Sequence, residues 1–147
     1  MPEGITKSFV TSSGLTISHL HSDSFTPKGR WGFFEYRDLG IAGATGGDVR
    51  AAVTKNVGQA GATTGWHYHV CDLQVVYFLQ GWADLEFEEE GVIHLLPGTC
   101  VQIPPGLIHN ELAMSDDMVA LEFSIPEKVE MVRVDPPAGW TPPAAHS

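Results

Sequence analysis

Two histidine-bearing segments, each framed by glycine, constrain the fold of this chain more than any other feature. The first covers residues 61–81 and reads GATTGWHYHVCDLQVVYFLQG; the second covers residues 98–109 and reads GTCVQIPPGLIH. Residues i and i+2 of a strand point to one face and lie about 6.5–7 Å apart. His67 and His69 can therefore converge on one ion, and the segment predicts a metal site built on β-strands.

Three further features would complete this site. Pro105-Gly106 fits the centre of a type II turn, in which glycine readily supplies the positive φ. His109 would then begin a strand that faces the histidine pair. Gln74 begins a run in which alternate side chains share one face of a strand. This alternation is out of phase with that of His67 and His69, so it must shift within residues 70–73. That change would swing Gln74 toward the site.

Short runs of β-branched and aromatic residues fill the rest of the chain, separated by many of its 16 glycines and 10 prolines. No stretch of a dozen residues keeps an apolar repeat of 3.6, so helices are not expected. Turn residues at this spacing predict an all-β sandwich or barrel. The expected strands are 14–20, 31–36, 49–56, 64–69, 73–80, 83–88, 92–95, 100–103, 109–113 and 118–123.

A chain of 147 residues is long enough for about one domain. Residues 31–134 are expected to form the barrel, after an N-terminal arm at 1–30 that packs on the barrel or on a neighbouring molecule. Residues 135–147 form a proline-rich tail in which Trp140 is the only large apolar side chain, and this composition favours a disordered terminus over a docked one.

Charge and hydropathy exclude several classes of partner. Asp and Glu outnumber Lys and Arg by 18 to 8, and no basic run is present, which argues against nucleic-acid binding. No stretch approaches the roughly 18 apolar residues of a membrane span, and the N-terminus lacks a secretory pattern, so a cytoplasmic location is expected. Cys71 and Cys100 are expected to be free thiols, buried as small hydrophobic groups; the alternative for Cys71 is a thiol near the metal.

The two segments resemble the two motifs of the cupin superfamily. The first motif is Gly, five residues, His-x-His, three or four residues, Glu, six residues, Gly; the second is Gly, five residues, Pro-x-Gly, two residues, His, three residues, Asn. Sixteen residues separate the two segments here. The matching positions are Gly61, His67, His69, Gly81, Gly98, Pro104, Gly106 and His109.

Two positions depart from the cupin pattern. Ala113 replaces the final Asn, which is not a ligand, and Gln74 replaces the glutamate ligand. Three histidines with a neutral amide leave a divalent ion with both positive charges, so a bound carbonyl or carboxylate should be more strongly polarised. A His-His-Gln-His set resembles that of cupins that act as sugar-acid ring openers and polyketide cyclases.

The resemblance implies a jelly-roll barrel of two antiparallel sheets, a homodimer, and one divalent ion held by His67, His69, His109 and Gln74. Imidazole and amide ligands suit Zn, Ni, Fe and Mn alike. The function that this set favours is non-redox Lewis-acid catalysis, of isomerase, lyase or cyclase type, on a small carbonyl or carboxylate substrate. An Fe(II) dioxygenase, a non-catalytic ligand-binding or sensory protein, and a metal-free barrel are the alternatives.

Four further side chains are candidates for the site, Arg50 and Phe78 in a substrate pocket and Tyr36 and Glu122 as an acid or base. Arg50 can clamp a substrate carboxylate or form a surface ion pair. Phe78 shares the alternation of Gln74 and can line the pocket or the core. Tyr36 and Glu122 have the chemistry of an acid or base, although their spacing does not require it.

Overall fold

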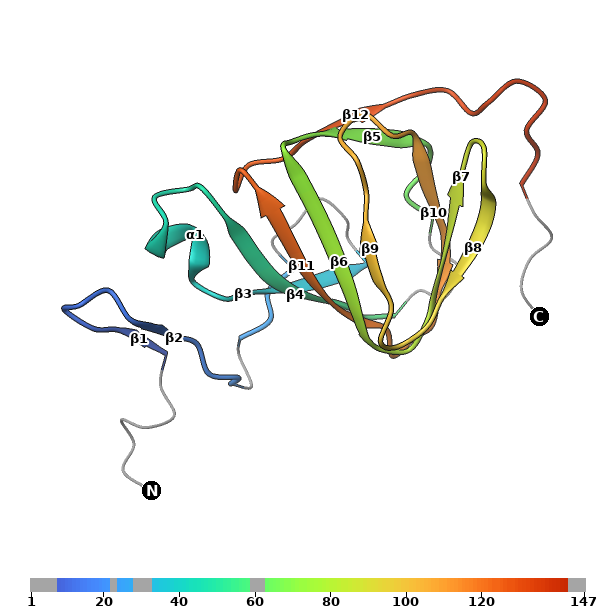
Figure 1. Cartoon of the computed structure of the whole chain (residues 1–147). Coiled ribbons are helices and arrows are strands. Elements are labelled where there is room, and N and C mark those ends of the chain that lie inside the picture. The colour runs from blue at the N-terminus through green and yellow to red at the C-terminus, as the bar shows by residue number, and fades with distance from the viewer. Residues whose placement is uncertain (1–7, 22–23, 28–32, 59–62, 143–147) are drawn as a thin grey trace.

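The computed structural model describes residues 8–21, 24–27, 33–58 and 63–142. These residues form two five-stranded antiparallel sheets and a separate two-stranded hairpin, as Figure 1 shows. The first sheet has the order β12 (Glu130–Arg133), β5 (His67–Val70), β10 (His109–Met114), β7 (Ala83–Phe87) and β8 (Gly91–Leu95). The second has the order β3 (Phe34–Asp38), β4 (Arg50–Asn56), β11 (Val119–Ile125), β6 (Leu73–Gln80) and β9 (Cys100–Gln102). The hairpin pairs β1 (Phe9–Val10) with β2 (Thr16–Ile17), and α1 (Ile41–Ala44) is a single helical turn.

The predicted all-β architecture is confirmed, and most strands lie within a few residues of their predicted bounds. Strand 73–80 is reproduced as β6. Strand 64–69 starts later, at His67, because Gly65 adopts a φ of 77° and bends the chain just before it. Strand 14–20 shrinks to the two residues of β2, while β1, β12 and α1 were not predicted. Residues 31 and 32 of the predicted strand 31–36 lie outside the described residues.

The hydrophobic core fills the space between the two five-stranded sheets. Each sheet contributes the inward-facing half of its alternating residues, which is the arrangement expected of packed antiparallel sheets. Fully burying one such side chain stabilises the fold by roughly 1.5–3 kcal/mol. The buried residues of this cluster are Phe34, Phe78, Ala83, Leu85, Phe87, Leu95, Ile103, Met114, Met118 and Ala120.

The chain crosses from one sheet to the other between β5 and β6. A bend at Cys71 and Asp72 separates the two strands, and the Asp72 amide donates to the carbonyl of Ile125 at 2.6 Å. This crossing explains why side-chain alternation was predicted to shift within residues 70–73. It places His67 and His69 on one sheet and Gln74 on the sheet that faces it.

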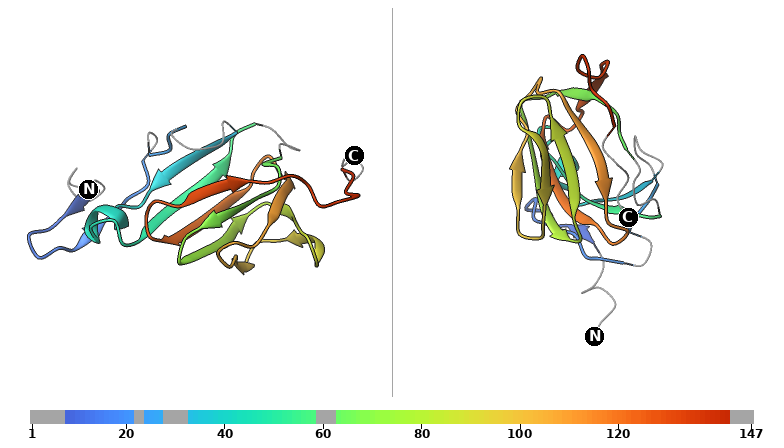
Figure 2. Two further views of the ribbon diagram at one scale, coloured as in Figure 1. Left: turned by 90° about the horizontal axis from the view of Figure 1, so that it is seen from above. Right: turned by 90° about the vertical axis from the view of Figure 1, so that its right-hand side faces the viewer.

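The two ends of the described chain behave differently. The hairpin β1–β2 projects away from the two sheets, as Figures 1 and 2 show. The C-terminal segment instead docks on the first sheet: the Trp140 indole N–H contacts both Glu86 carboxylate oxygens at 3.0 Å, and its ring packs edge-on against Trp66 at 5.7 Å. The tail is therefore docked through Trp140, contrary to the predicted disorder, and residues 143–147 lie outside the described residues.

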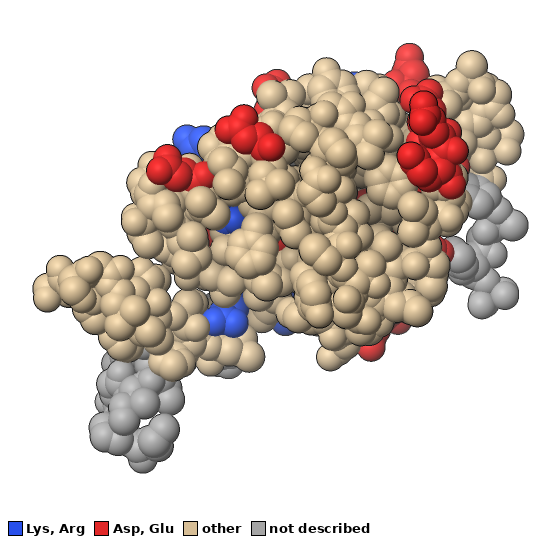
Figure 3. Space-filling model, in the orientation of Figure 1, with Lys and Arg blue, Asp and Glu red and all other residues tan. Residues whose placement is uncertain are grey.

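Some of the surface features were predicted from the sequence and others were not. Glu88, Glu89 and Glu90 form the exposed turn between β7 and β8, and Figure 3 shows acidic side chains gathered at that end of the molecule. Cys71 and Cys100 are free thiols as predicted. Cys100 is exposed rather than buried, because it lies on the edge strand β9 and alternates outward from the core. Over the described residues, no helix has the length and apolar character needed to cross a membrane.

Candidate metal centre

The three predicted histidines come together on the first sheet. His67 and His69 share one face of β5, and His109, the first residue of β10, is the direct cross-strand partner of His67. Their ring centroids are 4.4–5.3 Å apart, and one ring nitrogen from each lies within 4.8 Å of the others. All three side chains are buried. Within the described part of the chain, this is the one group of three or more histidine, cysteine or acidic residues that has metal-site spacing.

Backbone carbonyls orient two of the three imidazoles. The Nδ1 atoms of His67 and His109 lie 2.7 and 2.9 Å from the carbonyl oxygens of Gly65 and Leu107. An Nδ1–H that donates to a carbonyl leaves Nε2 unprotonated, and such carbonyl contacts are common behind metal-bound histidines. Burial lowers the pKa of His109, which favours the neutral form of its ring. The His109 Nε2 is buried with no hydrogen-bond partner among the described residues, so this donor set fits a divalent ion.

Two glycine turns fix the strands that carry the histidines. Gly65 precedes β5 with a φ of 77°, and Gly106 has a φ of 81° in the turn before β10. The Leu107 amide donates to the Pro104 carbonyl at 3.1 Å, which closes the predicted type II turn. The Gly106 amide donates to the His69 carbonyl at 3.0 Å and so ties the second motif to the first. Gly61, the first residue of the first motif, lies outside the described residues.

Gln74 lines the same cavity as His67 and His69, from the facing sheet. Its Oε1 is buried and has no hydrogen-bond partner among the described residues. A buried amide oxygen without a partner costs about 1–3 kcal/mol, so an ion or ligand that satisfies it would relieve this cost. Direct coordination by Gln74 stays a prediction.

The cavity at the centre has a volume of about 360 Å³ and draws its walls from both sheets. Arg50, a predicted pocket residue, lines it together with Tyr36 and Glu122, the candidate acid or base. Arg50 forms an ion pair with Glu122 at 3.2 Å, so the predicted ion pair exists inside the cavity wall. Phe78 belongs to the core and borders a smaller neighbouring cavity of about 40 Å³.

Glu111 and Ser124 also line this cavity and were missed by sequence reasoning. Burial, with a smaller contribution from the negative charge of Glu122, raises the pKa of the Glu111 carboxyl to about 8. The residue is half-buried as a whole, but its Oε2 is shielded from solvent. Glu111 is two residues after His109, so strand alternation from that ligand was the available signal.

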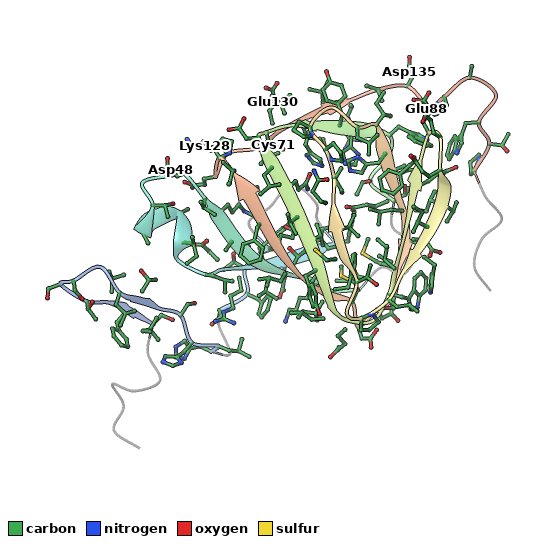
Figure 4. All side chains as sticks on the ribbon, viewed as in Figure 1. Asp48, Cys71, Glu88, Lys128, Glu130 and Asp135 are labelled. Atoms are coloured by element: carbon green, nitrogen blue, oxygen red, sulfur yellow. The ribbon has the colours of Figure 1, made fainter. Side chains whose placement is uncertain are left out.

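Cys71 and Trp66 lie outside the cavity wall. Burial, and secondarily the charge of Asp72, raises the pKa of the Cys71 thiol. Figure 4 shows Cys71 at the same end of the molecule as Lys128, a residue of the cavity rim. Trp66 packs edge-on against Trp140.

Comparison with solved structures identifies the fold. No protein-family model matches the sequence, and no curated protein matches it. KdgF from a Halomonas species is similar with a TM-score of 0.55 and 21% identity over 71% of this chain and 88% of that chain. The polyketide cyclase RemF from Streptomyces resistomycificus is similar with a TM-score of 0.63 and 16% identity over 83% of this chain and 88% of that chain. A cupin-like protein from Thermotoga maritima is similar with a TM-score of 0.57 and 21% identity over 77% of this chain and 89% of that chain. With its two facing antiparallel sheets, this chain has the fold of the cupin superfamily.

Proposed function

We propose that the protein is a metal-dependent enzyme that performs non-redox Lewis-acid chemistry, of isomerase, lyase or cyclase type, on a small carbonyl or carboxylate substrate. The observation that carries this proposal is the buried cluster of His67, His69 and His109, with the unpartnered amide oxygen of Gln74 on the same cavity. Zn, Ni, Fe and Mn all suit these ligands.

The neutral ligand set determines the kind of chemistry that is favoured. Three imidazoles and an amide contribute no negative charge, so they favour a divalent over a trivalent ion. When bound, such an ion polarises a substrate oxygen and stabilises negative charge that develops on it. The chain itself supplies Glu111 and Glu122, two carboxyl groups that line the cavity and have the chemistry to move a proton. The activity of RemF, a cyclase with a similar fold, supports the same reaction class.

The first test is metal content. Elemental analysis of protein purified without a nickel column should find about one divalent ion per chain. His67→Ala and His109→Ala should each lower the affinity for zinc by at least about tenfold. His94→Ala is the matched control, because His94 pairs with Asp84 on the opposite strand of the β7–β8 hairpin and lies outside the cluster. Wild-type protein that binds no divalent metal would exclude this proposal.

The second test separates the reaction classes. Metal-loaded protein is incubated with small oxo- and hydroxy-acids, and the products are followed by NMR. Isomerised, cleaved or cyclised products without oxygen uptake support Lewis-acid catalysis. Oxygen consumption by the iron-loaded protein would favour a dioxygenase instead. A compound that raises the melting temperature but is recovered unchanged would indicate a binding protein.

A further inference from the structure

A row of polar side chains crosses the second sheet on the cavity side. Arg50 on β4 is the cross-strand partner of Ser124 on β11, and Ser124 is in turn the partner of Gln74 on β6. All three residues line the 360 Å³ cavity. Neighbouring strands lie about 4.8 Å apart, so the backbones of Arg50 and Gln74 are roughly 10 Å apart. The row therefore runs from Gln74, at the candidate metal centre, to the positively charged side chain of Arg50.

Arg50 is held in place but keeps donors available. Its Nη1 contacts the Glu122 carboxylate at 3.2 Å, and its guanidinium carbon lies 5.8 Å from the centre of the Tyr36 ring. A guanidinium has five N–H donors in a fixed fork. Among the described residues, the contact with Glu122 is the one hydrogen bond that the Arg50 side chain makes. The remaining donors suit a planar oxyanion such as a carboxylate.

Ser124 provides a second, independent sign of a ligand. The residue is only 4% exposed, and its Oγ is buried with no hydrogen-bond partner among the described residues. Buried hydroxyl groups are normally hydrogen-bonded, so this one requires a partner that enters the cavity. Because Ser124 stands between Arg50 and Gln74 in the row, that partner would lie between the cation and the metal centre.

The charges of the lining favour an anion. Arg50, Lys128 and a divalent ion together bring four positive charges, against at most three negative charges from Glu111, Glu122 and Glu127. The volume of 360 Å³ equals about a dozen water molecules at roughly 30 Å³ each. A compact acid of about ten non-hydrogen atoms fits these limits.

We propose that Arg50, Ser124 and Gln74 form a recognition row for a short-chain oxo- or hydroxy-acid. The substrate carboxylate binds the guanidinium donors of Arg50 that Glu122 leaves available, in competition with the Glu122 carboxylate, and Ser124 donates to an oxygen beside it. The oxygen at the other end of the molecule reaches the metal centre. This inference rests on the proposed function. It adds that the substrate is anionic, and that several bonds separate its carboxylate from the oxygen that reaches the metal centre.

The probes are the straight-chain dicarboxylates from malonate to pimelate, each compared with its neutral diamide, in buffer free of other carboxylates. Calorimetric titration of zinc-loaded protein should show binding of at least one diacid and none of its diamide. Arg50→Gln should weaken that binding about 10- to 100-fold, the range for a hydrogen bond to a charged group. Arg50→Lys should fall between, because lysine keeps the charge but loses the fork. Ser124→Ala should weaken binding about 2- to 10-fold.

Glu122→Gln should have the opposite effect on diacid affinity. Because it removes the carboxylate that competes with the diacid for Arg50, it should tighten diacid binding several-fold. A purely structural ion pair would predict lower stability in both Arg50→Gln and Glu122→Gln with no change in diacid affinity. Lys55→Gln is the control on the same strand, since Lys55 pairs with Glu35 on the outer face. Equal affinity of wild type and Arg50→Gln, or no diacid preferred over its diamide, would overturn the inference.

Parallel titrations with zinc and with metal-free protein separate the two proposals. If zinc binds but Arg50→Gln leaves diacid affinity unchanged, the recognition row is wrong and the metal-dependent function stands. If zinc does not bind but the metal-free protein still prefers diacids through Arg50, the proposed function is wrong and the recognition row stands. Circular dichroism of each variant checks that it is folded before its affinity is compared.

Discussion

Gln74 has a neutral amide at the predicted fourth ligand position, and the charge at this position is the property that a single substitution tests most directly. Gln74→Glu would add a fourth carboxyl to a cavity that Glu111, Glu122 and Glu127 already line. In metal-free protein we expect a lower melting temperature, because like charges in a buried site repel. In zinc-loaded protein we expect tighter metal binding, by about tenfold, because the new ligand is anionic.

The measurement is the zinc-induced shift in melting temperature, which should be larger in Gln74→Glu than in wild type. Gln74→Ala controls for simple loss of the amide and should give a smaller shift than wild type. An identical shift in all three proteins would show that residue 74 does not contact the ion.

Glu111 predicts a pH dependence of stability for the metal-free protein. Its carboxyl has a pKa of about 8 in the folded state, against an ordinary value of 4.5, mainly because it is buried. The folded state then binds more protons than the unfolded state between these two values. The contribution of Glu111 to stability is therefore fully present below pH 4.5 and is lost as the pH rises toward 8.

Urea denaturation of wild type and Glu111→Gln at pH 5, 7 and 8.5 tests this expectation. The difference in free energy of unfolding between the two proteins should move in favour of Glu111→Gln as the pH rises. Glu88→Gln, on the exposed hairpin tip, should show no such trend. A pH-independent difference for Glu111→Gln would contradict the raised pKa.

At the scale of strands, local patterns were sufficient for most of the fold and for the histidine cluster. The glycine turns at Gly65 and Gly106 and the alternation of His67 and His69 act within a few residues, so they can be read from the chain. The row from Arg50 to Gln74 depends instead on the register of β4, β11 and β6, which long-range pairing determines. Ser124 carried no local signal for this reason.

The docked tail shows the same limit. Its prolines and small residues suggested disorder, but the decisive contacts join Trp140 to Trp66 and Glu86, which are more than 50 residues away in the chain. An edge-to-face aromatic pair contributes about 0.5–1.5 kcal/mol, and the indole hydrogen bond adds to it. Trp140→Ala should therefore lower the free energy of unfolding by about 1–2 kcal/mol.

Chemical denaturation measures this loss, and Trp140→Phe serves as the matched variant. Phenylalanine keeps the ring contact with Trp66 but not the N–H donor to Glu86, so its loss should be about half as large. Unchanged stability in Trp140→Ala would mean that the tail does not dock in solution.

For the whole molecule, the outer face of the second sheet raises the question of assembly. Tyr77 and Leu79 on β6 and Phe123 on β11 point outward and are 40%, 49% and 37% exposed. Toward the other edge, Phe25 lies against Lys55 and covers part of β4. The uncovered strands β11, β6 and β9 span roughly 14 by 23 Å, or about 300 Å². This is an apolar patch of a size that often marks an interface.

A second copy of this chain is the occupant that we expect. About 800 Å² per partner is typical of a stable interface, so the patch alone is too small. The projecting hairpin β1–β2 offers further apolar groups, Phe9, Val10 and Leu15, that the described part of the chain leaves exposed. Arms exchanged across a two-fold axis would supply the missing area.

Light scattering after size-exclusion chromatography should accordingly give the mass of a dimer for the wild-type protein. Tyr77→Lys combined with Leu79→Lys should shift it to the monomer mass, because two charges on each copy would have to be buried face to face. Val92→Lys, at an equally exposed apolar position on β8 of the other sheet, should leave the dimer intact. A wild-type monomer at micromolar concentration would show that the apolar face and the arm serve a different partner or remain exposed. Tyr77 and Leu79 do not line the cavity, so the monomeric double variant at these two positions should still bind zinc with wild-type affinity.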